Sequence, residues 1–447
     1  YKITSSVGLR HLFIGCAACS RKGKLSRMPA SPVTPGDDVP YSNIALHKRE
    51  TKGGSGYWSH PGICTVTFCE GDPKLVLESL RPKVKAVAEA NPWIAGKLTT
   101  APKQLAVPAK INDAIVSELL SMVKDPAVNR KQQYPALVKA TGANKALTVQ
   151  TGSKSAKLGL RICKCVVVEP ESTGGEFALI FSMSHVAADG HDYYKIFDMI
   201  AGSAPIEAMS PMRVAEYEAC EPEWTGNSDF KWISGGGGLI KGMLAGLLWG
   251  PKSQWCCYTV DDTKVAAAKA QAARDGGVAF CSTNDVLTSH FCKAAACRVG
   301  MMVINMRNKI RLPITDAHAG CYEMCLLLDP ANYADPAKIR KCISAGAPYT
   351  RQAPSPKLPG FWSSCPMALI TSWASFPFEI KIEGIDKQVL HLPCMAMPDM
   401  MDVAIAFKPQ PGKLGMLYLA KRAKPHTLMA PGTPLGATVD ENLFPVK

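Results

Sequence analysis

A histidine, an aspartate and a glycine at fixed spacing are the residues of this chain best suited to chemistry. The segment from Phe181 to Gly190 reads Phe-Ser-Met-Ser-His-Val-Ala-Ala-Asp-Gly, so His185 ends an apolar stretch and Asp189 follows four residues later. An imidazole can accept a proton from a nucleophile and return it. Asp189 before Gly190 indicates a tight turn whose carboxylate braces His185. Three fixed positions also arise by chance, so the pattern alone predicts a general base only weakly.

Hydrophobic periodicity predicts the elements that must position this histidine. In the first half, strands are expected over 63–70, 160–168 and 176–184, and helices over 74–90 and 193–200. In the second half, strands are expected over 255–260, 301–305, 367–373, 403–407 and 414–419, and helices over 263–274 and 286–297, the latter capped by Thr283-Asn284-Asp285. Because helices and strands alternate in both halves, the fold class is expected to be α/β.

Composition shifts divide the chain into four predicted parts. Residues 1–40 form a basic leader, 41–201 a first domain, 202–254 a connection and 255–447 a second domain. The connection is rich in glycine and expected to be irregular, and a stretch of that length is more typical of an inter-domain link than of a loop within one domain.

Four further motifs accompany the histidine motif, and together they resemble the CoA-dependent acyltransferase superfamily. His185-x-x-x-Asp189-Gly190 is similar to the signature of this superfamily. The other four matches occur along the chain in the same order as in the family: Asn91-Pro-Trp-Ile-Ala-Gly-Lys-Leu98 before the histidine, then Ser282-Thr-Asn-Asp-Val-Leu-Thr-Ser-His290, Asn305-Met-Arg-Asn-Lys309 and Thr371-Ser-Trp373. They span about residues 63–419. Ser184 stands where peptide-synthetase condensation domains carry a second histidine, which favours the stand-alone BAHD acyltransferases.

This resemblance implies two chloramphenicol-acetyltransferase-like domains, with mixed sheets flanked by helices and a tunnel between the domains. It implies that His185 is the general base, that Asp189 pairs with Arg307, and that Trp373 lies at the acyl-transfer centre. Gly190 would support the site structurally. Acceptor-pocket residues would be Thr371, Ser372 and His191, and cations for the CoA phosphates would be Arg298, Lys309 and Arg311.

The implied reaction moves an acyl group from acyl-CoA, as co-substrate, to a small-molecule alcohol or amine, with no permanently bound cofactor. Two departures mark distance from the family. The plant enzymes' Asp-Phe-Gly-Trp-Gly loop is replaced by residues 378–386, and Gly320-Cys321 stands for their Gly-Asn. An alternative is a catalytically degenerate fold that serves as an interaction subunit of a larger, organellar assembly. A third alternative is a lipid-directed acyltransferase.

Charge and cysteine content narrow the class of partner and compartment. The net charge is +14 without a long Lys/Arg run, which argues against a nucleic-acid arm and is compatible with phosphate ligands or acidic lipid. Seventeen cysteines without a regular framework favour reduced thiols and a reducing compartment. Cys16 and Cys19 make only half of a zinc site, so no metal is expected.

The chain contains two segments that could direct it to a membrane or an organelle. Residues before Asp37 include no acid but several cations and serines, as in an organelle targeting segment or an ordinary basic leader. No apolar run is long enough for a transmembrane helix. The apolar stretch from Leu239 to Trp249 is either a buried or interfacial helix of the connection, or a peripheral membrane anchor.

Overall fold

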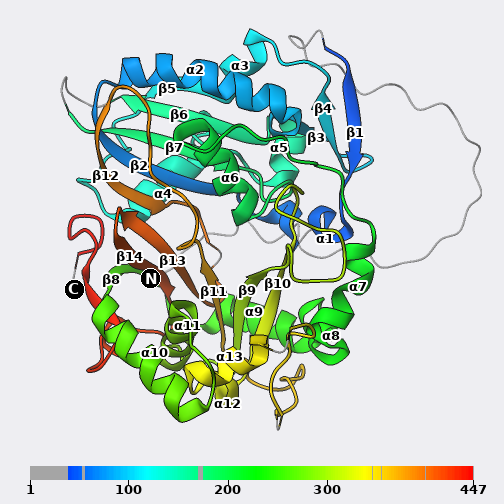
Figure 1. Cartoon of the computed structure of the whole chain (residues 1–447), viewed down its shortest axis with the longest axis vertical. Helices are drawn as coiled ribbons and strands as arrows, with labels where there is room; N and C mark the ends of the chain where they lie inside the picture. The colour runs from blue at the N-terminus through cyan, green and yellow to red at the C-terminus, as the bar shows by residue number, and fades with distance from the viewer. Residues whose placement is uncertain are drawn as a thin grey trace, which may run out of the picture. The chain divides into compact units, whose positions relative to one another are not determined.

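Two mixed β-sheets organise the computed structural model, which describes residues 39–52, 56–169, 175–344, 346–353, 355–397 and 399–445. The predicted leader up to residue 38, with Cys16 and Cys19, lies outside the described residues. Four strands of the five-stranded sheet come from the first half of the chain, and all strands of the seven-stranded sheet come from the second half (Figure 1).

The first sheet is built around a fully buried central strand. Its order is β12 (Ile385–Pro393), β2 (Ile63–Gly71), β7 (Phe177–Met183), β6 (Cys163–Glu169) and β5 (Leu120–Lys124). All residues of β7 are buried, because β7 is hydrogen-bonded between β2 and β6. Helix α2 (Pro73–Ala90) begins where the Asp72 side chain accepts from the backbone N–H groups of Lys74 and Leu75, and it ends before Pro92.

The second sheet brings several strand ends to one edge. Its order is β10 (Glu323–Leu328), β9 (Val299–Asn305), β11 (Met367–Ser372), β13 (Asp402–Gln410), β14 (Lys413–Ala420), β8 (Gln254–Val260) and β15 (Leu435–Thr438). Because β9, β11 and β13 are parallel, their carboxyl ends share an edge. Strand β10 is antiparallel to β9 with Glu323 opposite Asn305, so β10 begins at that same edge.

Helices and a small sheet complete the two halves. The first half also contains α1 (Lys48–Thr51), α3 (Asp113–Leu119), α4 (Tyr134–Ala143), α5 (Gly152–Leu158), α6 (Gly190–Ala201), and a sheet of β1 (Tyr41–Ala45), β4 (Gln104–Pro108) and β3 (Lys97–Leu98). The second half contains α10 (Asp262–Gly276), α11 (Thr283–Ala294), α12 (Pro330–Tyr333), α13 (Pro336–Ser344) and α14 (Pro425–Leu428).

Every strand and helix expected from periodicity is present, with ends shifted by a few residues. Two expectations were wrong. The connection over 202–254 is not irregular but contains α7 (Glu216–Thr225), α8 (Asn227–Ile233) and α9 (Gly237–Trp249). Helix α11 begins at Thr283, because Ser282 and Asp285 form a reciprocal capping box and Ser282 is the cap.

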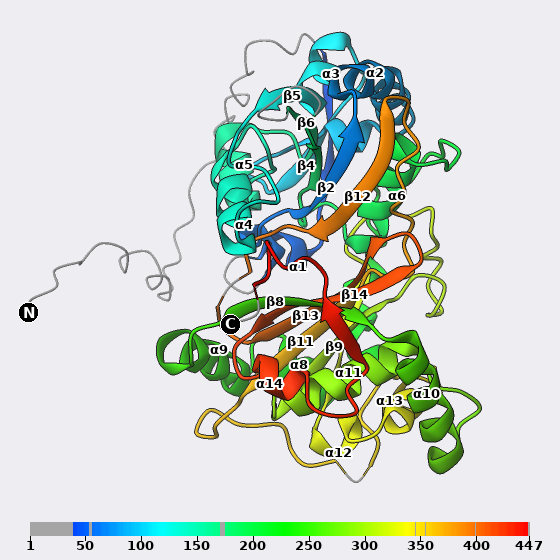
Figure 2. The same cartoon turned by 90° about the vertical axis from the view of Figure 1, so that its left-hand side faces the viewer.

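One strand crosses the predicted boundary between the two halves, which itself stays a prediction. Strand β12, from the second half of the sequence, pairs with β2 and thereby completes the sheet of the first half (Figure 2). After Ile385 the strand continues with three polar residues in a row, Asp386 to Gln388, so hydrophobic alternation is missing there and periodicity did not predict the strand. The second half of the chain therefore contributes one strand to the sheet of the first half.

Candidate functional site

His185 and Asp189 lie in the turn between β7 and α6. Asp189 is the N-cap of α6, and its carboxylate accepts from the backbone N–H groups of His191 at 3.0 Å and Asp192 at 3.3 Å. This capping ends the turn four residues after His185 and fixes the direction in which α6 leaves the sheet. His185 thus lies between β7, the central strand of the first sheet, and the capped N-terminus of α6.

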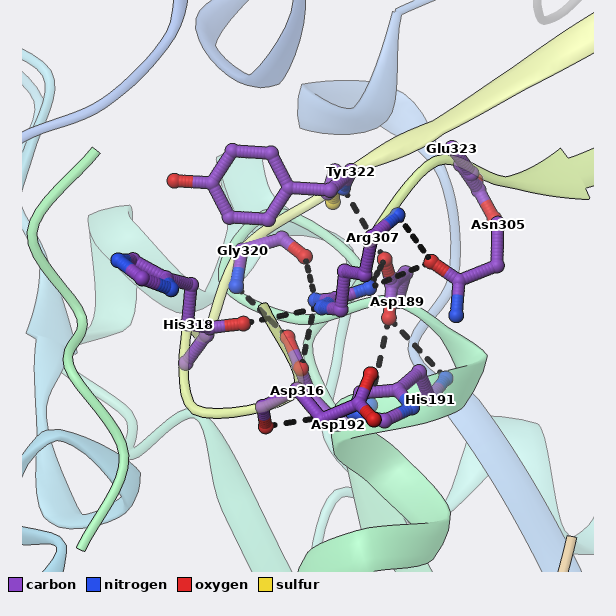
Figure 3. A network of polar contacts seen from close by, with 12 residues as sticks. Asp189, His191, Asp192, Asn305, Arg307, Asp316, His318, Gly320, Tyr322 and Glu323 are labelled. Carbon is purple, nitrogen blue, oxygen red and sulfur yellow. Dashed lines mark hydrogen bonds and ion pairs between the residues drawn. The ribbon is translucent and has the colours of Figure 1, made fainter. Parts of the chain in front are cut away.

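An ion pair joins this turn to the second sheet (Figure 3). The guanidinium of Arg307, which follows β9, donates to Asp189 at 2.7 Å and to Asp192 at 2.7 Å. The backbone N–H of Tyr322 donates to the same Asp189 oxygen at 3.0 Å. The pairing expected between Asp189 and Arg307 is therefore present, and it ties the histidine turn to the shared edge of β9 and β10.

The pKa values of Asp189 and Asp192 are shifted in opposite directions, although both carboxylates contact Arg307. Burial would raise the pKa of Asp189, but the charge and hydrogen bonds of Arg307 outweigh burial and hold that pKa below its usual value. Burial, reinforced by the charge of Asp189, holds the pKa of Asp192 well above its usual value despite Arg307. One guanidinium therefore stabilises one buried carboxylate better than two.

His185 is partly exposed and lies among polar groups. Its side chain is 21% exposed, and its Nε2 lies 3.8 Å from a carboxylate oxygen of Glu323, the first residue of β10. The ring of Tyr57 stacks on the imidazole with centroids 4.6 Å apart. The hydroxyl of Tyr57 donates to Glu323 at 2.7 Å and accepts from Arg49 at 2.6 Å. The imidazole is thus partly exposed, and its protonated form would face a carboxylate.

Cys321 and His60 are the other reactive-type side chains near His185. The thiol of Cys321 lies 3.8 Å from Nδ1 but donates to the backbone carbonyl of His185 at 3.0 Å. Burial, aided by Glu50, raises the pKa of Cys321 well above its usual value, so a thiolate nucleophile is disfavoured. Burial, and then the neighbouring His185, lower the pKa of His60 to about 4, so His60 is neutral near pH 7.

The residues expected at the acyl-transfer centre and acceptor pocket are spread around α6 and β11. Trp373 is nearly buried, and its indole nitrogen packs 3.5 Å from where a side chain at Gly190 would begin. Within the described ranges, no hydrogen bond or ring contact links Trp373 to His185. The half-buried Thr371 and Ser372 end β11, and His191 lies 3.9 Å from the carboxylate of Asp316.

A cavity of about 920 Å³ opens beside the shared edge of the second sheet. Asn305 and Ser372 line it, whereas His185 does not. Its lining is cationic, with Lys269, Lys309, Arg340, Lys408 and Lys413 against Asp262 and Glu379. Arg340 is engaged by the buried carboxylate of Asp285 at 2.6 Å. The tunnel expected between the halves stays a prediction.

The three cations expected from sequence to meet CoA are found in different places. Only Lys309 lines the cavity. Arg298 precedes β9 at the opposite end of the strand, where it donates to the carbonyl of Ser364 at 3.2 Å. Arg311 is exposed and is not part of the lining.

Sequence reasoning missed Glu323, Tyr57 and the cavity lysines other than Lys309. Glu323 could have been found, since the strand after Gly320-Cys321 must begin at the edge where the strand before Arg307 ends. Tyr57 gives no such signal, because it precedes the first predicted strand and its partner Glu323 lies 266 residues away. Within the described residues, no cluster of three His, Cys, Asp or Glu side chains could hold a metal ion.

Comparisons with known proteins bear on the fold. No protein-family model and no curated protein sequence matches the chain. Among solved structures, TRI101 of F. graminearum with coenzyme A and deoxynivalenol is 11% identical with a TM-score of 0.57, over 86% of this chain and 96% of that one. Vinorine synthase is 12% identical with a TM-score of 0.53, over 92% and 97%.

A third similar structure is polyketide synthase associated protein 5 from Mycobacterium tuberculosis. It is 14% identical, with a TM-score of 0.53, over 87% of this chain and 96% of that one. At such identities the likeness concerns the fold, and it extends over most of the chain. The chain therefore has the α/β fold of these structures, with mixed sheets flanked by helices as expected from the sequence.

Proposed function

We propose that the protein transfers an acyl group from acyl-CoA to the hydroxyl or amine of a small molecule, with His185 as the general base. The observation that carries this proposal is a partly exposed imidazole at the end of the central strand, held by a capped turn that Arg307 ties to the opposite sheet. The fold likeness supports it, since TRI101 was crystallised with coenzyme A.

The proposed reaction uses one imidazole twice. Nε2 of His185 accepts the proton of the acceptor, whose oxygen or nitrogen bonds to the thioester carbonyl carbon. The C–S bond then breaks, and the sulfur of CoA leaves with the proton from Nε2. The carboxylate of Glu323 stabilises the imidazolium that exists between these steps. The indole N–H of Trp373, with backbone donors, is proposed to stabilise the negative carbonyl oxygen.

The cationic cavity is the proposed binding site for the CoA phosphates. Lys269, Lys309, Lys408 and Lys413 line it, and none forms an ion pair in the described part of the chain. Lysine ammonium groups are suited to phosphate. Ser372 places the cavity at the end of β11, next to Trp373. Thr371 and His191 are proposed for the acceptor side, and roles for Arg298 and Arg311 stay predictions.

The test is thiol release from a panel of acyl-CoAs, with and without alcohol and amine acceptors. His185→Ala is expected to lower the rate about 10²- to 10⁴-fold, as loss of a general base does. His426→Ala, at an exposed histidine of α14, is the matched control and should keep the wild-type rate. Equal rates for wild type and His185→Ala would remove the imidazole from the mechanism.

A further inference from the structure

Helix α9 has its small residues turned inward and its large apolar residues turned outward. Side chains added at Gly238, Gly242 or Gly246 would meet the protein's own atoms at 2.9 Å or less, including the carbonyls of Pro359, Cys365 and Met400. These three glycines recur every fourth residue and form one face of the helix. The opposite face carries Ile240, Leu244, Leu247 and Leu248, all of them exposed.

Aromatic side chains extend this exposed face. Trp249 is 78% exposed at the end of α9, and Trp362 is 89% exposed in the neighbouring loop. Phe361 also lies beside the start of α9, because a side chain added at Gly237 would meet its ring at 3.4 Å. The α9 patch is defined here as Ile240, Leu244, Leu247, Leu248, Trp249, Phe361 and Trp362. A contiguous exposed patch of large apolar side chains usually marks a surface that binds a protein partner, a ligand or a membrane.

Most charged side chains around the α9 patch are cations, and the one acid beside the end of α9, Asp399, is paired with Lys421 at 2.7 Å. Residues 230–260 and 336–378, which contain the patch and its flanks, include no Asp or Glu. Lys241 lies inside the patch, with its ammonium 5.7 Å from the ring centre of Phe361 and 6.0 Å from that of Trp362. Lys252 and Lys357 are exposed in the flanking segments. The face thus combines large apolar groups, tryptophans and cations.

We infer that the α9 patch docks onto an anionic lipid surface. Leucine and tryptophan side chains enter the boundary between headgroups and acyl chains, and lysines hold anionic headgroups. Figure 2 shows α9 at the outer margin of the second half, with no other labelled element beyond it. None of the helices in the described ranges is both long and apolar enough to cross a bilayer. The contact is therefore with the surface of the membrane.

Charge complementarity favours an anionic lipid surface over a second copy of the chain and over the chain's own basic leader. A second copy of the chain would bring Lys241 and its flanking lysines against the same cations, since a twofold interface places one patch on itself. The segment before Asp37 contains cations and no acid, so it would also be repelled. An anionic bilayer is the occupant that satisfies both the apolar groups and the lysines.

Vesicle flotation of the full chain tests this inference. The wild type is expected to float with vesicles of phosphatidylcholine and phosphatidylglycerol and not with phosphatidylcholine alone, and binding should weaken as salt rises. Leu247→Gln combined with Leu248→Gln should lower the bound fraction about tenfold or more. Lys241→Gln should weaken binding to the anionic vesicles. The matched control is Leu158→Gln, at an exposed leucine of α5, which should bind as the wild type does.

Three results would overturn the inference. They are no flotation of the wild type, unchanged flotation of the double variant, and a dimer seen by sedimentation velocity that the double variant abolishes without any lipid binding. The second result would assign lipid binding to the basic leader, which all variants retain. Thiol release measured without vesicles should be the same for all these chains, so a failure here is distinct from a failure of the proposed function.

Discussion

At the scale of single residues, Glu323 is the neighbour of His185 with the clearest chemical consequence. Its carboxylate lies 3.8 Å from Nε2 and is held by the Tyr57 hydroxyl. Glu323→Gln keeps the shape of the side chain but removes the charge that would face an imidazolium. The acyl-transfer rate is expected to fall about ten- to a hundredfold. Initial-rate measurements with saturating acyl-CoA check this.

The control for Glu323→Gln is Glu78→Gln, an exposed glutamate of α2. It should leave the rate unchanged. Thermal unfolding of both variants should match the wild type, because Glu323 is itself partly exposed. A wild-type rate for Glu323→Gln would show that the carboxylate does not act on the imidazole.

Asp189 and Asp192 are predicted to differ in their effect on stability. The folded pKa of Asp189 is lowered, so its ion pair stabilises the fold above the pKa of an unfolded aspartate, and this stability is lost as pH falls. Asp189→Asn should lower the free energy of unfolding by about 3–5 kcal/mol at pH 7. The difference from wild type should shrink below about pH 4.

The Asp192→Asn variant provides the contrast. Its folded pKa is raised, so ionising Asp192 works against the fold as pH rises, and its amide variant should cost less stability at pH 7 than Asp189→Asn. Urea unfolding at pH 7 and near pH 4 measures both differences. An equal loss for the two variants would contradict the unequal sharing of Arg307.

Residues of the site differ in how far the sequence alone predicts them. His185, Asp189 and Gly190 come from one short segment, and Arg307 and Trp373 follow strands that alternation detects. The contacts of His185 with Tyr57 and Glu323 depend on long-range folding, and no local pattern encodes them. The cavity lysines come from α10, from the loop after β9 and from β13 and β14, so their convergence is a property of the tertiary fold.

At the scale of elements, the loop between β9 and β10 is held by Gly320, the glycine that matches the first residue of the family's Gly-Asn pair. Gly320 has φ +147, donates its N–H to Asp192 at 2.7 Å and offers its carbonyl to Arg307 at 2.9 Å. Gly320→Ala should cost about 1–3 kcal/mol of unfolding free energy because an L residue is strained at this φ. Chemical denaturation measures this cost.

Gly190 is the matched control within the same site. A side chain there would meet Trp373 and Phe376 at 3.5 Å, which is an ordinary contact, and its backbone is not at positive φ. Gly190→Ala is therefore expected to change stability by less than about 1 kcal/mol. A larger loss for Gly190→Ala than for Gly320→Ala would show that the motif glycine, and not the loop glycine, carries the constraint.

Element boundaries show why some structure escaped prediction. Residues 237–249 are apolar on every side except at Lys241, so periodicity could not tell which face packs inward. The answer depends on Gly238, Gly242 and Gly246 approaching the loop that follows α13 and the start of β13. Tertiary contacts thus decided both the helicity of the connection and the orientation of its outer face.

At the scale of the whole molecule, strand β12, which the second half contributes to the first sheet, makes the first half dependent on the second. It pairs with β2, where Leu390 lies opposite Phe68 and Leu392 opposite Val66. Without β12, the edge of β2 would expose unpaired backbone groups and apolar side chains. A fragment of residues 39–254 is therefore expected to be insoluble or partly unfolded when expressed alone.

Co-expression of residues 39–254 with residues 255–447 should restore a soluble complex, because the second fragment supplies both β12 and Arg307. Arg307→Met in the second fragment should weaken the complex, since it leaves Asp189 buried without its cation. Solubility and co-purification measure both effects, and Arg422→Met at an exposed arginine is the control. A first fragment that folds alone would show that the first half is an independent domain and that its sheet does not need β12.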